Sequence, residues 1–124
     1  MLHSFVFRSR TLARLGLTAM ILAAPMAIPV GAAQSKREAV YVDVVTYVIK
    51  AHLCSIGTGN KSYLSKALRD GRAWMIKAGY SGRDADARLR SLVTKLNARN
   101  KGLVVPADDQ LCRKVLSEHP RARY

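Results

Sequence analysis

The stretch that decides the fold is residues 35–54, SKREAVYVDVVTYVIKAHLC. Its first four residues match the capping box, in which a serine hydroxyl and a glutamate carboxylate satisfy free backbone N–H groups at the start of a helix. On a helical wheel, Asp43, Thr46 and Lys50 share one narrow polar stripe, and nearly all other positions from Val40 onward are apolar. The stretch therefore predicts a helix that is the most buried one of its domain.

The same stretch also suits a β-strand, because much of the run 40–49 is β-branched. A strand here would pair with the apolar run Leu103–Val105 in a small sheet. The length of the apolar pattern and the capping box favour the helix over this alternative.

A second helix is expected after a break at residues 55–60. Asn60 or Ser62 can cap its start, and Gly79 is typical of a helix C-terminus. Its apolar positions recur at helical spacing: Leu64, Ala67, Leu68, Gly71, Met75 and Ala78.

Two more helices are expected toward the C-terminus. Asp84 can cap the third, which runs to a stop at residues 100–102, and Asp108 begins a short fourth helix after an extended connection. The apolar positions of the third helix are Ala85, Leu89, Leu92, Val93 and Leu96. Those of the fourth are Leu111, Cys112, Val115 and Leu116.

The chain has two cysteines, Cys54 and Cys112. In an exported protein we expect them to form one intramolecular disulfide. Pairing between two chains and half of a metal site are the alternatives, but no second cysteine pair and no nearby histidines supply the four ligands that zinc prefers. The fold prediction is therefore an all-α, disulfide-stapled bundle of about four helices.

Residues 1–33 are expected to be a cleaved signal peptide. Three arginines and no carboxylate precede an uncharged apolar block that ends in small residues. The dense part of this block is shorter than the roughly 20 residues that a membrane-spanning helix needs. An uncleaved anchor or a mitochondrial presequence are the alternatives. We expect residues 34–124 to form a single helical domain in the periplasm or outside the cell.

The most unusual property of the chain is its basic charge. It has 21 Lys and Arg residues against 8 Asp and Glu residues, a formal net charge of +13. Residues 34–124 hold 18 of the cations and all 8 acids, a net charge of +10, which is more than solubility requires and predicts an anionic partner. The expected contact residues are Arg88, Lys95 and Arg99 on the third helix and Lys66, Arg69 and Lys77 on the second. A solvated surface without a partner is the simpler alternative.

Two short motifs resemble ligand-binding loops but fail in their spacing. Residues 57–62, GTGNKS, lack the glycine that must directly precede the lysine of a phosphate-binding loop. The pair Asp84 and Asp86 begins like a calcium loop, but Arg88 occupies the next ligand position. No metal and no cofactor are therefore expected.

Three further side chains are also assigned structural roles. We expect Trp74 and Tyr63 at the edge of the core rather than in a binding platform. We expect His52 near the C-terminal end of the first helix. No catalytic signature is present.

We therefore expect a non-enzymatic exported protein that binds an anionic partner through a basic face. The partner is an acidic protein, an anionic polysaccharide, lipopolysaccharide or phospholipid headgroups. No nucleic acid is expected, because no recognition motif for it is present and export argues against it. A periplasmic stress chaperone and an inhibitor or immunity-type protein are alternatives. A small enzyme is the least favoured.

Overall fold

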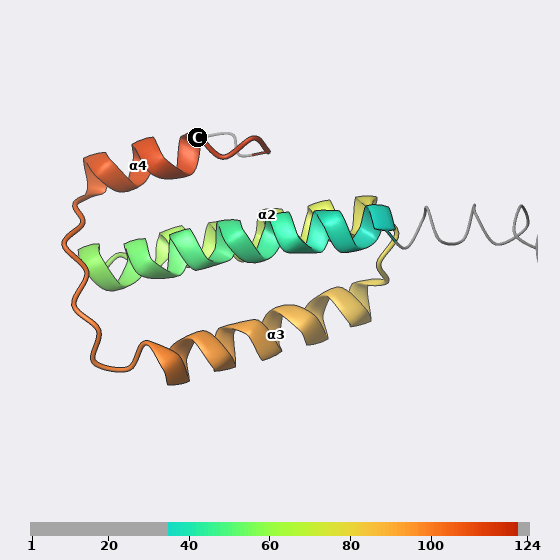
Figure 1. Cartoon of the computed structure of the whole chain (residues 1–124), viewed down its shortest axis with the longest axis horizontal. Coiled ribbons are helices and arrows are strands. Elements are labelled where there is room, and N and C mark those ends of the chain that lie inside the picture. The colour runs from blue at the N-terminus through green and yellow to red at the C-terminus, as the bar shows by residue number, and fades with distance from the viewer. Residues whose placement is uncertain (1–34, 122–124) are drawn as a thin grey trace, which may run out of the picture. The chain divides into compact units, whose positions relative to one another are not determined.

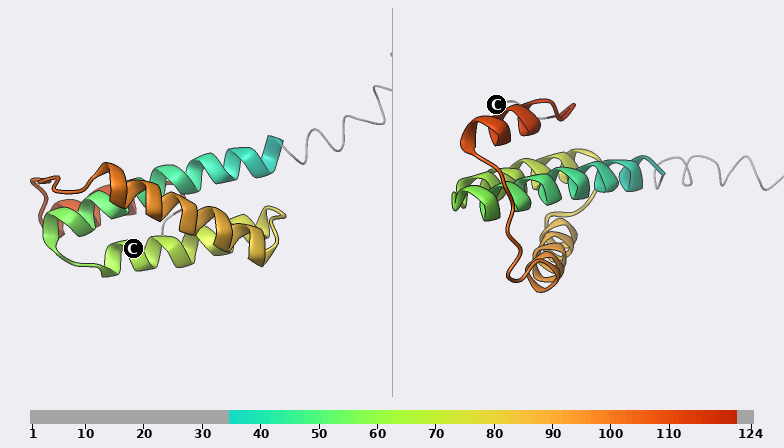
Figure 2. Two further views of the ribbon diagram at one scale, coloured as in Figure 1. Left: turned by 90° about the horizontal axis from the view of Figure 1, so that it is seen from below. Right: turned by 60° about the vertical axis from the view of Figure 1, so that its left-hand side comes forward.

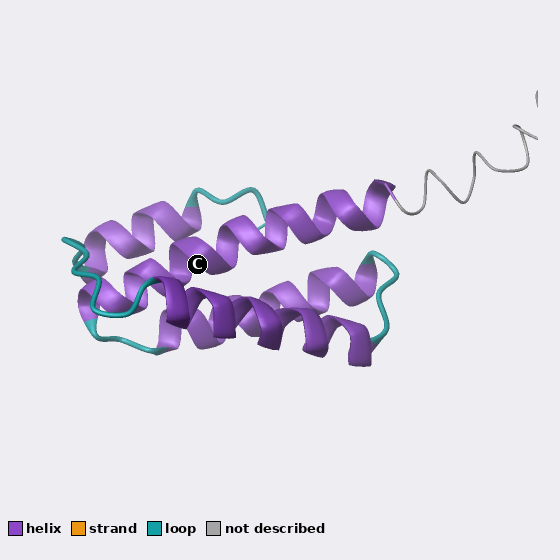
Figure 3. Ribbon diagram, turned by 60° about the horizontal axis from the view of Figure 1, so that its bottom comes forward, coloured by secondary structure: helices purple, strands orange, loops and turns teal. Residues whose placement is uncertain are grey.

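Four helices joined by loops make up residues 35–121, the part of the chain that the computed structural model describes (Figure 3). The helices are Ser35–Thr58, α2 (Ser62–Lys77), α3 (Gly82–Arg99) and α4 (Asp109–Ser117). No strand occurs among these residues, so the prediction of a small all-α bundle is confirmed and the strand alternative for residues 40–49 is wrong. The predicted signal peptide, residues 1–33, lies outside the described residues.

The Ser35–Thr58 helix supplies most of the core. Val44, Tyr47, Val48 and Ala51 are completely buried along one of its faces. By length and composition alone this helix is apolar enough to cross a membrane, with a mean hydropathy of 1.4. Core helices of soluble proteins pass the same test, and here the apolar face packs against the rest of the bundle.

This helix ends later than the sequence predicts. Residues 55–58 continue it, so the predicted break at 55–60 is wrong in its position. The Thr58 hydroxyl donates to the Cys54 carbonyl at 2.7 Å, and the Gly59 N–H donates to the Ser55 carbonyl at 3.0 Å. Gly59 has a φ of 74°, the left-handed conformation with which many helices end.

His52 therefore lies well inside the helix rather than at its end, and the prediction for this residue is also wrong. Only 5% of the residue is exposed. It is a core residue.

Helix α2 crosses the Ser35–Thr58 helix at Gly71. A Cβ atom there would lie 2.8 Å from Cγ1 of Val44, so the glycine allows a close approach of the two helices. Its N-cap is Lys61, which forms no side-chain cap hydrogen bond, so the expectation that Asn60 or Ser62 caps it is wrong. The Asn60 side chain instead accepts from the Ser62 N–H at 3.0 Å across the turn that precedes the helix. At its end, Gly79 has a φ of 112°, as its predicted role at the C-terminus requires.

Helix α3 begins two residues before its predicted cap. Ser81 is the N-cap, and its hydroxyl accepts from the Asp84 N–H at 3.1 Å. Asp84 lies in the first turn, so its assignment as the cap is wrong. The buried residues of α3 are Ala85, Leu89 and Leu96.

Helix α4 begins as predicted, because the Asp108 side chain accepts from the Leu111 N–H at 2.7 Å. Its apolar side is narrower than predicted. Leu116 and Cys112 are completely buried, whereas 47% of Leu111 is exposed. The expected disulfide is present, and it joins Cys54 and Cys112 with a Cα–Cα distance of 5.7 Å.

Helices α3 and α4 lie on opposite sides of the pair formed by α2 and the Ser35–Thr58 helix (Figures 1 and 2). The connection between α3 and α4 passes the end of the Ser35–Thr58 helix. At Gly57 it comes so close that an added Cβ atom would lie 2.8 Å from the Val105 carbonyl oxygen. Each of the two outer helices therefore covers its own side of the central pair.

Candidate anion-binding surface

The three cations predicted on α3 do not form one free stripe. The Arg88 guanidinium lies 5.1 Å from the ring centroids of both Tyr41 and Tyr80, and it pairs with Asp84 at 3.3 Å. Although burial opposes its charge, Asp84 and its other acidic neighbours outweigh this effect and raise the pKa of Arg88. Arg88 therefore connects α3 to the Ser35–Thr58 helix, and its guanidinium is already engaged by Asp84 and two tyrosine rings.

Lys95 and Arg99 lie farther along α3. Both side chains are exposed, and neither forms an ion pair within residues 35–121. They remain available to solvent, but without Arg88 they are two charges on one helix face.

The three cations predicted on α2 divide between two sides of the helix. Arg69 lines a hollow shared with α3, whereas Lys66 and Lys77 line hollows on the side of α4. Lys66 is partly buried and pairs with Asp70 at 2.6 Å, an i,i+4 contact. Lys77 is exposed. The predicted set is therefore not a single surface.

A more concentrated basic surface lies along α2 on the side of α4. It consists of two hollows of about 610 Å³ and 750 Å³ that share Lys66, and we call it the α2–α4 groove. The cations that line it are Lys36, Lys66, Lys77, Arg113, Lys114 and Arg121. One carboxylate, Asp70, lines it among the described residues, and this group is already paired with Lys66.

Polar uncharged groups complete the first hollow, namely Asn60, Ser62, Ser117 and Tyr63. The Tyr63 hydroxyl donates to Asp109 at 2.7 Å. This hydrogen bond, together with burial, raises the pKa of Tyr63 above its ordinary value. The bond also fixes the start of α4 against the start of α2.

An aromatic cluster supports the second hollow. Trp74 and His119 lie nearly parallel, with ring centroids 6.1 Å apart and an interplanar angle of 6°, and Tyr47 packs against both at 5.1 Å and 4.7 Å. Trp74 is at the edge of the core as predicted, whereas Tyr63 is buried.

Asp43 links this aromatic cluster to the end of the described chain. The Arg121 Nε donates to Asp43 at 2.8 Å, and His119 Nε2 lies 3.0 Å from the other oxygen of Asp43, although that approach is not aligned as a hydrogen bond. His119 is 4% exposed. These contacts hold Arg121 at the edge of the groove.

Arg113, Lys114 and Arg121 were expected only as part of a widely positive surface, and the contact of Asp43 with His119 was not expected. The first two directly follow Cys112, so the disulfide was a usable signal for their position beside the central helices. Asp43 and Arg121 are 78 positions apart, and no local pattern connects them.

No group of three or more His, Cys, Asp or Glu residues within 35–121 is arranged to hold a metal ion. Residues 57–62, the sequence that superficially resembles a phosphate loop, contain the end of one helix, a turn and the start of α2. Asp84 and Asp86 pair with Arg88 and Arg72, respectively.

Comparison with known proteins found no family model that matches this chain, and no curated protein or solved structure that is significantly similar to it.

Proposed function

We propose that this protein is an exported, non-enzymatic binding protein that holds a polyanionic partner in the α2–α4 groove. The observation that carries the proposal is the charge of the groove lining, which has six cations and one carboxylate. Two of the six cations are paired, Lys66 with Asp70 and Arg121 with Asp43, and the other four form no ion pair within residues 35–121. Export rests on the charge and hydropathy pattern of residues 1–33 and on the disulfide, a bond that persists in oxidising compartments.

The fold fixes the position of the helix that carries Arg113 and Lys114 before any partner binds. The disulfide fixes α4 beside the central helices, and the Tyr63 to Asp109 bond fixes its start. Rigid placement of charged groups lowers the ordering cost of binding. Lys36, Lys77 and Lys114 form no ion pair within the described part of the chain, so their charge is available to a partner.

The chemistry of the groove suits a row of anionic groups, as on an acidic polysaccharide, on lipopolysaccharide or on an acidic protein segment. Hydroxyl and amide groups lie between the cations and can hydrogen bond to a polar backbone. Binding through exposed charges weakens as salt increases, because ions screen the attraction.

The test is retention on a sulfated polysaccharide column, with disulfide-bonded protein purified after expression of the full chain. One triple variant removes groove charges: Lys36→Gln, Lys77→Gln and Lys114→Gln. Its matched control removes the same charge elsewhere: Lys95→Gln, Arg99→Gln and Lys101→Gln. All six positions are exposed.

We expect the groove variant to elute at clearly lower salt than the control, although the two have equal net charge. Elution of both variants at the same salt concentration would show that retention depends on net charge alone, and it would overturn the proposal. Earlier elution of the control variant would instead assign binding to the C-terminal half of α3.

The alternative expectation of a stress chaperone requires release of the apolar Ser35–Thr58 helix. That helix contacts all three others: α2 at Gly71, α3 through Tyr41 and Arg88, and α4 through the disulfide. These contacts hold the helix in the bundle, so the binding function is the one that the geometry of residues 35–121 supports best.

A further inference from the structure

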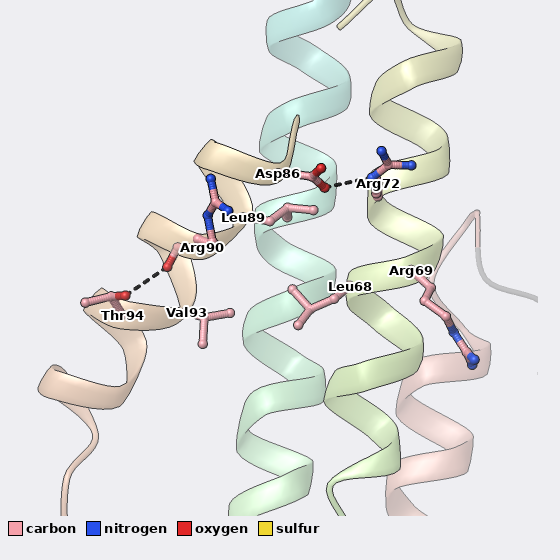
Figure 4. A pocket seen from close by; sticks show the side chains of 8 residues that line it. All are labelled: Leu68, Arg69, Arg72, Asp86, Leu89, Arg90, Val93 and Thr94. Carbon is pink, nitrogen blue, oxygen red and sulfur yellow. Dashed lines mark hydrogen bonds and ion pairs between the residues drawn. The ribbon is translucent and has the colours of Figure 1, made fainter. Parts of the chain in front are cut away.

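A second hollow, of about 580 Å³, lies between α2 and α3, outside the α2–α4 groove. Leu68 of α2 and Leu89 and Val93 of α3 point toward one another and form its apolar floor (Figure 4). Arg72 and Asp86 form an ion pair of 2.7 Å across one end. Arg90 extends along α3 toward that same end.

We propose that this hollow binds a single-chain anionic amphiphile, with its hydrocarbon chain on the Leu68, Leu89 and Val93 floor and its headgroup beside Arg72 and Arg90. The shared chemistry of such ligands is one acyl or alkyl chain that ends in a carboxylate, sulfate or phosphate.

The charge at the end of the hollow favours an anionic headgroup. Two guanidinium groups lie near a single carboxylate, and the hydrogen bond from Arg72, with a further contribution from the charge of Arg90, lowers the pKa of Asp86. Asp86 therefore neutralises one arginine and leaves the other in excess. Guanidinium groups bind carboxylate, sulfate and phosphate oxygens in two-point contacts, which suits a headgroup at this end.

The floor favours a hydrocarbon chain over a polar polymer. Its three side chains offer no hydrogen-bonding group, and the one hydroxyl at the edge, that of Thr94, already donates to the Arg90 carbonyl at 3.0 Å. The α2–α4 groove differs in this respect, because serine, asparagine and lysine side chains line its first hollow. The two sites therefore select different ligands.

The size of the hollow favours a small ligand over a protein. A hollow of this volume is in the range of small-molecule pockets, roughly 300 to 1,000 Å³. Its eight lining residues fall short of the roughly 20 to 30 residues that each partner contributes to a stable protein interface. A symmetric dimer formed through this hollow would bring the arginines of the second copy against these ones, which is unfavourable.

The test is calorimetric titration with dodecanoate, below the concentration at which it forms micelles, of protein purified after expression of the full chain. Two further probes separate the parts of the ligand: butyrate has the headgroup with a short chain, and dodecyl maltoside has the chain without the charge. Two variants separate the parts of the site: Arg90→Gln removes a headgroup contact, and Val93→Thr places a hydroxyl on the floor at nearly constant volume. Lys101→Gln is the charge control, because it removes the same charge at an exposed position outside the hollow.

We expect one saturable site for dodecanoate and no measurable binding of butyrate. Arg90→Gln is expected to weaken dodecanoate binding about fivefold or more and to leave dodecyl maltoside unchanged. Val93→Thr is expected to weaken the binding of both dodecanoate and dodecyl maltoside, and Lys101→Gln is expected to weaken the binding of neither. The groove variant used above should bind dodecanoate as the wild type does, so the two proposals can fail separately.

Three results would overturn this proposal. The first is the absence of saturable binding. The second is equal binding of butyrate, which would indicate an anion site without a chain site. The third is a dimer in sedimentation experiments that Val93→Thr disrupts, which would assign the hollow to a second copy of the chain.

Discussion

Helices α3 and α4 cover opposite sides of the same central pair, but different interactions hold them there. Helix α3 has 18 residues and buries Ala85, Leu89 and Leu96, while arginine contacts fix its first half. Helix α4 has nine residues and buries two of them, Cys112 and Leu116. A covalent bond to Cys54 holds it in place.

The difference shows how length decides what a helix needs. Isolated helices shorter than about 12 to 15 residues are marginal in water, so α4 depends on its attachment to the bundle. Helix α3 is long enough to present a full apolar stripe of its own. Four changes test this contrast, in order of decreasing expected effect.

Removal of the disulfide should have the largest effect. In the chain-entropy model, a crosslink between positions separated by 58 residues contributes about 4 kcal/mol to stability. We expect Cys54→Ala with Cys112→Ala to lower the free energy of unfolding by about this amount in urea denaturation. Amide exchange should increase first in α4, while α3 keeps its protection. Loss of protection in both helices together would contradict the contrast between them.

Truncation of a core leucine should have the next largest effect, and each outer helix offers a matched position. Leu116 of α4 is completely buried and Leu89 of α3 is 6% exposed. Leucine to alanine changes in cores cost about 2 to 5 kcal/mol. We expect Leu116→Ala to cost more than Leu89→Ala in the same denaturation experiment, because α4 has fewer other apolar contacts. A cost near zero for Leu116→Ala would show that the disulfide holds α4 without this burial.

Loss of a helix cap should cost about 1 kcal/mol in either helix. Ser81 caps α3 and Asp108 caps α4, each through one side-chain hydrogen bond to the backbone. We expect Ser81→Ala and Asp108→Ala to lower the free energy of unfolding by similar amounts. An effect near zero for Asp108→Ala would mean that the disulfide keeps α4 helical without its cap.

The sequence predicted those features of the fold that depend on neighbouring residues. Gly79 ends α2, Asp108 caps α4 and the apolar run from Val40 is a buried helix, because local sequence determines each of these. The predicted end of the first helix was wrong because the sequence has two glycines there, Gly57 and Gly59, and either of them could end a helix. Gly57 stays helical beneath the Val105 carbonyl, and this contact comes from a distant part of the chain.

The candidate site was harder to predict for the same reason. Arg88 shares an arc of the helical wheel with Lys95 and Arg99, but the rings of Tyr41 and Tyr80 that engage it belong to other segments. The α2–α4 groove combines residues from four segments, and the disulfide and the fold bring them together. A helical wheel shows which face of a helix is basic, but it does not show which other helix covers that face.

The smallest expected effects are changes in the free energy of unfolding with pH. The two outer helices should each lose a stabilising contact, but at opposite ends of the pH range. Arg72 donates to Asp86 and lowers the pKa of this carboxyl from its ordinary 3.8, so the contribution of this pair is present above pH 3.8. It is lost as the pH falls through the lower pKa of the folded state. The hydrogen bond to Asp109 raises the pKa of Tyr63 above 10.0, so its contribution is present below pH 10 and is lost as the pH rises through the folded-state pKa.

Acid should therefore weaken a polar contact of α3, and alkali one of α4. The measurement is the free energy of unfolding of each variant relative to the wild type, in urea, from pH 2.5 to 11. The difference between wild type and Asp86→Asn should shrink below pH 4, and the difference between wild type and Tyr63→Phe should shrink above pH 10. A constant difference for Tyr63→Phe across the alkaline range would show that its hydrogen bond to Asp109 does not stabilise α4 in solution. The disulfide would then be the dominant attachment of that helix, which sharpens its contrast with α3.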